Sequence, residues 1–343
     1  MAETWIRRLG TKKSGFRYVD AEGRGVRDAR TLARVDQLRV PPAWRNVHVA
    51  PDARRAIQAW GFDVRGRKQY RYNERAVEKR ELRKYYRVRQ LAKLLPRVRR
   101  ALRVQSHARE LTRDTVCAIA LRLIGESLFR PGSEKYVREN RSYGMTTMLK
   151  RHVDVSDGRA VFTYPAKSSK KQRQLVTNAE LVKLVTRLRR TPGDRLFRYR
   201  DARESAWCDL KARELIHYLR ANVGPFAVKD FRTWGGTLRA AIVLAELGPG
   251  RSDTETKRNV ALAMRIVASE LGNTPAICRK SYVHPMVLAR YVDDGETIPL
   301  RGIARRGPDT FAHSPDERAL IAFLDRHFPE RRRRPRAEMD RAA

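Results

Sequence analysis

The chain has 343 residues, and 75 lysines and arginines against 38 aspartates and glutamates give it a formal net charge of +37. So large an excess indicates a polyanionic partner, because phosphates attract basic side chains whatever the surrounding sequence. Three widely spaced cysteines argue against a disulfide framework or a paired zinc knuckle, and no apolar run approaches the ~20 residues that span a bilayer. We therefore expect a soluble, cytoplasmic protein of two globular domains, with no bound metal and no membrane contact.

The first predicted domain, residues 1–80, is a small and mostly β module. Short alternating runs such as Val47-His48-Val49 and Gln69-Tyr70-Arg71-Tyr72 are typical of strands, and Pro41-Pro42 breaks the chain between them. Alternation along a strand places Tyr70 and Tyr72 on one face. There they could contact bases or sugars in a nucleic-acid groove, and packing into the core of the sheet is about as good an interpretation.

A dense basic helical pattern follows over residues 74–113, with an interruption expected near Pro96. The second domain, residues 81–328, is expected to be mainly α-helical. Its predicted helices cover residues 114–129, 178–190, 204–219, 231–247 and 253–271.

Short β-like segments lie between the first two of these helices. Together with the turn Ser156-Asp157-Gly158 they predict a small antiparallel sheet, so the fold class is α+β. The arginine-rich residues 329–343 are expected to be a disordered tail. The β-like segments are residues 142–148, 152–155, 160–164 and 172–176.

Four segments of the second domain carry residue types suited to phosphoryl chemistry. No GxxxxGK[ST] loop is present, so no nucleotide cofactor is expected. Transfer of a phosphoryl group needs an oxygen nucleophile, cations on the nonbridging oxygens and an acid for the departing oxygen. The segments are Phe129-Arg130-Pro131-Gly132, Tyr164-Pro165-Ala166-Lys167, Lys229-Asp230-Phe231-Arg232-Thr233, and Gly272-Asn273-Thr274-Pro275 with Lys280-Ser281-Tyr282.

In order and spacing these segments resemble the catalytic motifs of the poxvirus-like bacterial type IB DNA topoisomerases. The resemblance covers nearly the whole chain and extends to Gly66-Arg67-Lys68-Gln69-Tyr70-Arg71-Tyr72, which is similar to the family's DNA-contacting segment. It implies that the second domain has the fold shared by topoisomerase IB and tyrosine recombinases. It also implies a nucleoid-associated monomer that clamps duplex DNA, preferentially supercoiled, and relaxes it without ATP or metal.

The resemblance gives each residue of the site a role. Tyr282 would attack a backbone phosphate to form a 3′-phosphotyrosyl link, and religation would reverse that step. The guanidinium forks of Arg130 and Arg232 fit the two nonbridging oxygens. Lys167 would be the general acid, and only the resemblance selects it over Lys170 and Lys171.

Asn273 stands where poxvirus relatives carry a histidine. Its amide can donate the same hydrogen bond to a nonbridging oxygen but has no titratable charge. We expect cleavage to show no pH step from this position, whereas Asn273→His would introduce one near neutral pH. The residues expected to contact DNA are Arg67, Tyr70, Tyr72, Tyr136 and Lys229.

Two other functions remain open at this point. A tyrosine recombinase would share the two arginines, the lysine and the tyrosine, but typically shows His-x-x-Arg where this chain has Lys229-x-x-Arg232. Recombinases also usually carry a helical N-terminal domain. A non-enzymatic nucleic-acid-binding protein would explain the charge and leave Tyr282 and its spaced partners as coincidence.

Overall fold

The computed structural model describes residues 5–166, 170–201, 206–299 and 311–328. The chain divides into two compact units, the first ending at Lys84 and the second beginning at Tyr85. This division falls inside the long helix α2 (Glu74–Ser106), as does the boundary predicted after residue 80. Within the described ranges, no helix combines the length and the apolar character that a membrane span requires.

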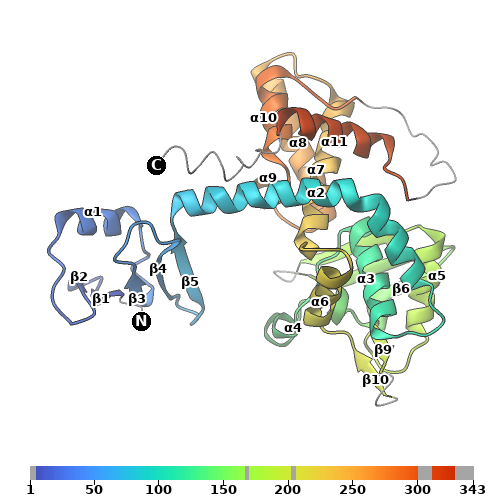
Figure 1. Ribbon diagram of the computed structural model, residues 1–343, viewed down its shortest axis with the longest axis horizontal. Helices are drawn as coiled ribbons and strands as arrows, with labels where there is room; N and C mark the ends of the chain where they lie inside the picture. The colour runs from blue at the N-terminus through green and yellow to red at the C-terminus, as the bar shows by residue number, and fades with distance from the viewer. Residues whose placement is uncertain (1–4, 167–169, 202–205, 300–310, 329–343) are drawn as a thin grey trace, which may run out of the picture. The chain divides into compact units, whose positions relative to one another are not determined.

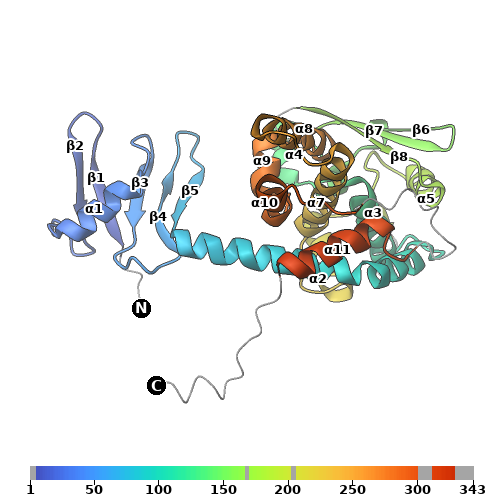
Figure 2. The same ribbon diagram turned by 90° about the horizontal axis from the view of Figure 1, so that it is seen from above.

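The first unit is a five-stranded antiparallel sheet in the order β2–β1–β3–β4–β5, with helix α1 across one face (Figures 1 and 2). Val35 of α1 packs against Val47, Val49 and Ala59 of the sheet to form a small core. Because side chains alternate along a strand, the residues between these core positions lie on the opposite face. The elements are β1 (Ile6–Thr11), β2 (Gly15–Val19), α1 (Ala29–Gln37), β3 (Arg45–Val49), β4 (Ile57–Phe62) and β5 (Lys68–Tyr72).

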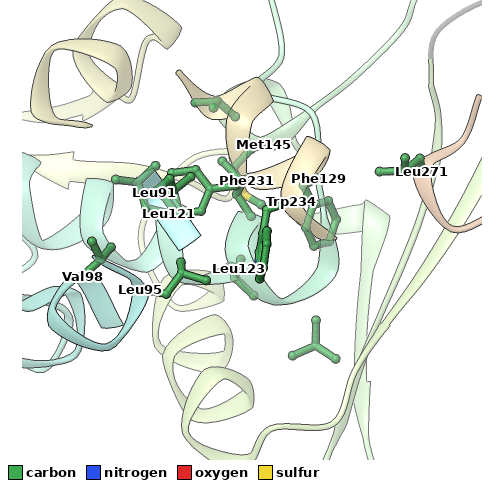
Figure 3. Packing of buried hydrophobic residues seen from close by; sticks show 14 of the residues in the cluster. Leu91, Leu95, Val98, Leu121, Leu123, Phe129, Met145, Phe231, Trp234 and Leu271 are labelled. Atoms are coloured by element: carbon green, nitrogen blue, oxygen red, sulfur yellow. The ribbon is translucent and has the colours of Figure 1, made fainter. Parts of the chain in front are cut away.

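The second unit is mainly helical and contains the larger core. Helix α3 (Arg113–Ser127) is buried along most of its length, because the residues from Thr115 to Leu121 are all apolar or small. It packs against α7 (Val228–Leu247), which in turn packs against α8 (Asp253–Leu271). Figure 3 shows how side chains of α2, α3 and α7, among them Leu95, Leu123 and Trp234, gather in this core.

A three-stranded antiparallel sheet, in the order β6–β7–β8, belongs to this unit. Its strands are β6 (Val153–Ser156), β7 (Arg159–Pro165) and β8 (Lys171–Val176). The first two strands are joined by a tight turn in which Asp157 and Gly158 have φ of +47° and +69°. On β7 the buried residues alternate as Ala160, Phe162 and Tyr164, so this face of the sheet packs on the helices.

The remaining elements complete the helical unit. They are α4 (Glu134–Asn140), η1 (Met145–Thr147), η2 (Lys150–His152), α5 (Ala179–Arg189), β9 (Arg198–Arg200), β10 (Trp207–Asp209), α6 (Ala212–Asn222), α9 (Pro275–Ser281), α10 (Pro285–Asp294) and α11 (Pro315–His327). A small β unit followed by a mainly helical unit with a small antiparallel sheet confirms the predicted α+β class.

Three local predictions are wrong. Helix α2 runs through Pro96 without interruption, because burial of Leu91, Leu95 and Val98 on both sides outweighs one lost backbone hydrogen bond. Residues 142–148 contain η1 in place of a strand, since the Gly144 backbone packs closely on Gly132 and its N–H binds a threonine hydroxyl.

The helix predicted from residue 204 begins only at Ala212, because residues 207–209 pair with β9 as strand β10. The arginine-rich tail, residues 329–343, lies outside the described residues.

Candidate active site

Arg232 is a buried cation on helix α7, with 3% of its surface exposed. Its guanidinium donates through Nη1 to the carbonyl of Leu128 and through Nη2 to the carbonyl of Leu271, at 2.9 Å for the second. Leu128 caps the C-terminus of α3 and Leu271 ends α8, so Arg232 binds carbonyls that have no partner within their own helices. Burial lowers the pKa of the Arg232 guanidinium, and the phenol of Tyr282 opposes that shift.

Arg130 lies just beyond α3 and binds the same end of α8. Its Nη2 donates to the carbonyl of Gly272 at 2.8 Å and to Oδ1 of Asn273 at 2.7 Å. Gly272 has a φ of +62°, and a Cβ on it would lie 2.3 Å from Oε1 of Gln172 on β8. The left-handed backbone favours a glycine at this position, and a larger residue would also displace the end of the Gln172 side chain.

Two buried donors in this cluster have no hydrogen-bond partner among the described residues: Nδ2 of Asn273 and Nε of Arg232. The acceptor end of the Asn273 amide is occupied by Arg130, so its NH₂ group is the end left to donate. Buried donors are nearly always paired in folded proteins. Unpaired donors beside two guanidinium groups are suited to an anion such as a phosphate.

Tyr282 follows helix α9 and is half-buried beside α7. The hydroxyl of Thr237 on α7 donates to the Tyr282 carbonyl at 3.4 Å, and a Cβ on Gly236 would lie 2.9 Å from that oxygen. The Tyr282 ring has Lys229 Nζ 5.1 Å and Arg232 Cζ 5.2 Å from its centroid, both within cation–π range. The predicted nucleophile therefore sits beside two cations of α7.

Tyr164 is a second tyrosine near the arginines, and sequence reasoning assigned it no role. It is buried, its hydroxyl donates to Oε1 of Gln174 at 2.6 Å, and burial raises its pKa to about 12 while Arg232 and Arg130 oppose the shift. Its place as the first residue of the motif that ends at Lys167 was the available signal. Lys167 lies outside the described residues.

Three of the predicted DNA contacts lie in the first unit. Tyr70 and Tyr72 are each 39% exposed on the sheet face opposite the core, with ring centroids 5.9 Å apart. They are thus not packed inward. Arg67, just before β5, pairs with Asp63 at 2.7 Å.

Sequence reasoning missed other members of this exposed face. Lys68 Nζ lies 3.7 Å from the ring centroid of Trp60, which stacks on His48 at 4.0 Å, and Arg80 lies over Tyr72 at 4.7 Å. The alternation that places the two tyrosines together also places Lys68 with them, so the signal was present in β5. We call Lys68, Tyr70, Tyr72, Trp60 and His48 the aromatic face.

The other two predicted contacts belong to the second unit. Tyr136 is 55% exposed on α4, a helix with no buried residue. Lys229 is the cation over the ring of Tyr282. The structure thus joins Arg130 and Asn273 at the end of α8 and places Arg232 and Lys229 beside Tyr282. Tyr136 lies on an exposed helix.

Known proteins match both units. A family model described as the catalytic core of eukaryotic DNA topoisomerase I matches residues 66–298, and a model of the N-terminal domain of bacterial DNA topoisomerase IB matches residues 15–63. DNA topoisomerase 1B of Acanthamoeba polyphaga mimivirus is 33% identical over 297 residues, which are 83% of this chain and 88% of the viral protein. DNA topoisomerase 1B of vaccinia virus (strain Copenhagen) is 22% identical over 245 residues, 68% of this chain and 72% of that protein.

These matches confirm the family that the motifs indicated. The catalytic-core model spans more than half of the chain, and the mimivirus relative aligns along most of both sequences. This chain belongs to the type IB DNA topoisomerases.

Proposed function

We propose that this enzyme relaxes supercoiled duplex DNA by cutting and resealing one strand through Tyr282. The phenolic oxygen attacks a backbone phosphorus, the bond to the 5′-oxygen breaks, and a 3′-phosphotyrosyl link forms with release of a 5′-hydroxyl. The duplex rotates about the intact strand, and the 5′-hydroxyl then attacks the link to restore the phosphodiester. Because the phosphodiester energy is retained in the covalent link, the cycle needs neither ATP nor a metal.

The arrangement around the end of α8 carries this proposal. Arg130 and Arg232 both bind backbone carbonyls there, and Tyr282 lies beside Arg232. The unpaired Nδ2 of Asn273 and Nε of Arg232 add donors for the nonbridging oxygens. Fixed donors in a buried site stabilise the charge that develops on a pentacoordinate phosphorane. Because these donors need not reorganise during the reaction, they can account for much of the catalysis.

The departing 5′-oxygen needs a proton, and we assign that role to Lys167. A lysine can serve as a general acid where neighbouring positive charges disfavour its protonated form. In religation the same group would take the proton back from the 5′-hydroxyl.

DNA binding would use both units of a monomer. Arg67, Tyr70 and Tyr72 are assigned to the duplex in the first unit, and Tyr136 and Lys229 in the second. With a net charge of +37, binding should weaken by orders of magnitude between ~50 and ~200 mM salt. A preference for supercoiled DNA and a place in the cytoplasmic nucleoid complete the proposal.

The test is relaxation of negatively supercoiled plasmid in EDTA without ATP, followed by detergent trapping of any covalent adduct. Wild type should relax the plasmid and leave its tyrosine on a 3′ end, and Tyr282→Phe should lose both activities while still binding DNA. Tyr164→Phe is the matched control, because Tyr164 is the other tyrosine near the arginines and its hydroxyl is already bonded to Gln174. Binding without relaxation or adduct by wild type would overturn the proposal.

A further inference from the structure

Helix α2 contacts the site through an ion pair with Asp230, the residue that follows Lys229. Arg87 donates from Nε to Oδ2 of Asp230 at 2.6 Å and from Nη2 to Oδ1 at 2.8 Å. The Asp230 carboxylate is fully buried, and it also accepts the backbone N–H of Ala227 at 2.8 Å, so it caps the first turn of α7. The Arg87 fork therefore fixes the turn of α7 that carries Lys229 and Arg232.

The same stretch of α2 also reaches the segment that carries the nucleophile. Tyr85, two residues before Arg87, donates its hydroxyl to the carbonyl of Val283 at 3.1 Å. Its ring lies 4.6 Å from that of His284, whose backbone N–H donates to the hydroxyl of Thr237 at 3.0 Å. The backbone just after Tyr282 is thus held from two helices. Tyr85 of α2 binds Val283, and Thr237 of α7 binds Tyr282 and His284.

We propose that Arg87 and Tyr85 are positioning residues for strand cleavage. Together they fix the position of the turn of α7 that carries Arg232 relative to the segment that carries Tyr282. This inference rests on the proposed function and assigns a catalytic contribution to a helix that supplies no group to the phosphate.

The geometry explains why an arginine is needed at position 87. A guanidinium binds both oxygens of a carboxylate at once and so fixes its orientation, whereas an ammonium acts as a point charge. With Arg87 replaced, Asp230 is a buried charge with only its capping contact, and the turn must move to rehydrate it. A displacement of about 1 Å in a transesterification site costs roughly 10²-fold in rate.

The chain offers a closely matched control on the same helix. Arg99 of α2 donates to both oxygens of the buried Glu317, at 3.0 and 2.5 Å, and Glu317 caps α11 by accepting the backbone N–H of Ser314 at 2.9 Å. The exposed fractions of the two arginine side chains are also similar, 37% for Arg87 and 32% for Arg99. The Arg87 pair holds the turn of α7 that carries Lys229 and Arg232, whereas Glu317 of the Arg99 pair meets Trp234, further along α7.

The experiment compares Arg87→Gln with Arg99→Gln in single-turnover cleavage of saturating duplex DNA, with thermal unfolding measured for both. We expect similar losses of Tm, a cleavage rate about 10²-fold lower for Arg87→Gln, and a change below about threefold for Arg99→Gln. Religation should slow by the same factor as cleavage, so the covalent fraction at equilibrium should not change. Arg87→Lys should recover only part of the rate.

Equal rates in the two variants, or a slow rate explained by weaker DNA binding, would overturn the inference. If Arg87→Gln does not fold, Tyr85→Phe decides, because it removes one hydroxyl and should slow cleavage about fivefold or more through the lost hydrogen bond to Val283. An unchanged rate in Tyr85→Phe would then reject it. A wild-type enzyme without any cleavage would reject the proposed function itself.

Discussion

The aromatic face of the first unit and the cation cluster of the second, which consists of Arg130, Arg232 and Lys229, both carry positive charge, yet they are built in opposite ways. On the aromatic face Lys68 lies over the half-buried ring of Trp60, and Tyr70 and Tyr72 are more than a third exposed. In the cation cluster Arg232 is almost wholly buried, and Arg130 and Arg232 each bind fixed acceptors at the end of α8.

The difference indicates a division of work. Exposed cations on flexible side chains can adjust their positions to bind successive DNA phosphates. Salt screens their contribution to the binding free energy. Buried guanidinium groups held by carbonyls cannot adjust, so they suit one charge distribution, that of a transition state. Changes in the first unit should therefore alter binding, and changes in the second should alter the rate at saturating DNA.

The largest effect is expected at Arg232. Arg232→Lys keeps the charge but loses the fork that spans Leu128 and Leu271, so single-turnover cleavage should slow by about 10²- to 10³-fold. Affinity for DNA, measured by a filter or gel assay, should change by less than about twofold. If weaker DNA binding accounted for the whole loss of rate, the proposed division between binding residues and catalytic residues would be wrong.

Asn273 gives a smaller effect with a distinct pH signature. Asn273→Ala should slow cleavage about tenfold through one lost hydrogen bond to a charged group. In Asn273→His the protonated imidazole adds positive charge beside the phosphate, so the rate should be higher at low pH and fall as pH rises through about 6.5. A pH profile of cleavage identical to that of wild type would count against a contact with the phosphate.

On the aromatic face the expected change is in binding alone. Lys68→Ala should weaken DNA binding a few-fold at low salt and reduce the slope of log affinity against log salt by about 1. The cleavage rate of the saturated complex should stay as in wild type. Lys12→Ala, an exposed lysine outside the aromatic face, is the control, and an equal effect there would show that the face has no special role.

The smallest effect concerns the stability of the second unit in acid. Burial, with Arg151 and Arg195, lowers the pKa of His152 to about 4, and its Nδ1 accepts the backbone N–H of Leu149. Because the unfolded chain binds this proton near pH 6.5, the free energy of unfolding should fall as pH drops from about 6.5 towards 4. Urea unfolding at pH 7 and 5 should show a smaller difference in His152→Gln than in wild type.

The sequence predicted the parts of this molecule that depend on local pattern. Helices α3, α7 and α8 and strands β7 and β8 begin and end within a few residues of their predicted positions, because their apolar periodicity is strong. The motifs also singled out Arg232 and Lys229, which lie beside Tyr282, and Arg130 and Asn273, which contact each other; the catalytic roles of these residues stay predictions. Lys167 and the tail lie outside the described residues, so their roles stay predictions.

Long-range partners could not be predicted in this way. The contact of Arg130 with Asn273 joins positions 143 residues apart, and so does that of Arg87 with Asp230. Periodicity shows which side of a helix is apolar and carries no information about which carbonyl or carboxylate a distant arginine will meet. The continuity of α2 through Pro96 is missed for the same reason, since burial by distant residues decides it.

The shared attachment of both arginines to the end of α8 has a mechanical consequence. Because Leu271, Gly272 and Asn273 are consecutive, an intact end of α8 holds acceptors for both guanidinium groups at a fixed spacing. Fraying of the last turn is different, because it would release the two cations separately. The left-handed Gly272 is thus the point at which heat should first disorganise the site, before the helices around it unfold.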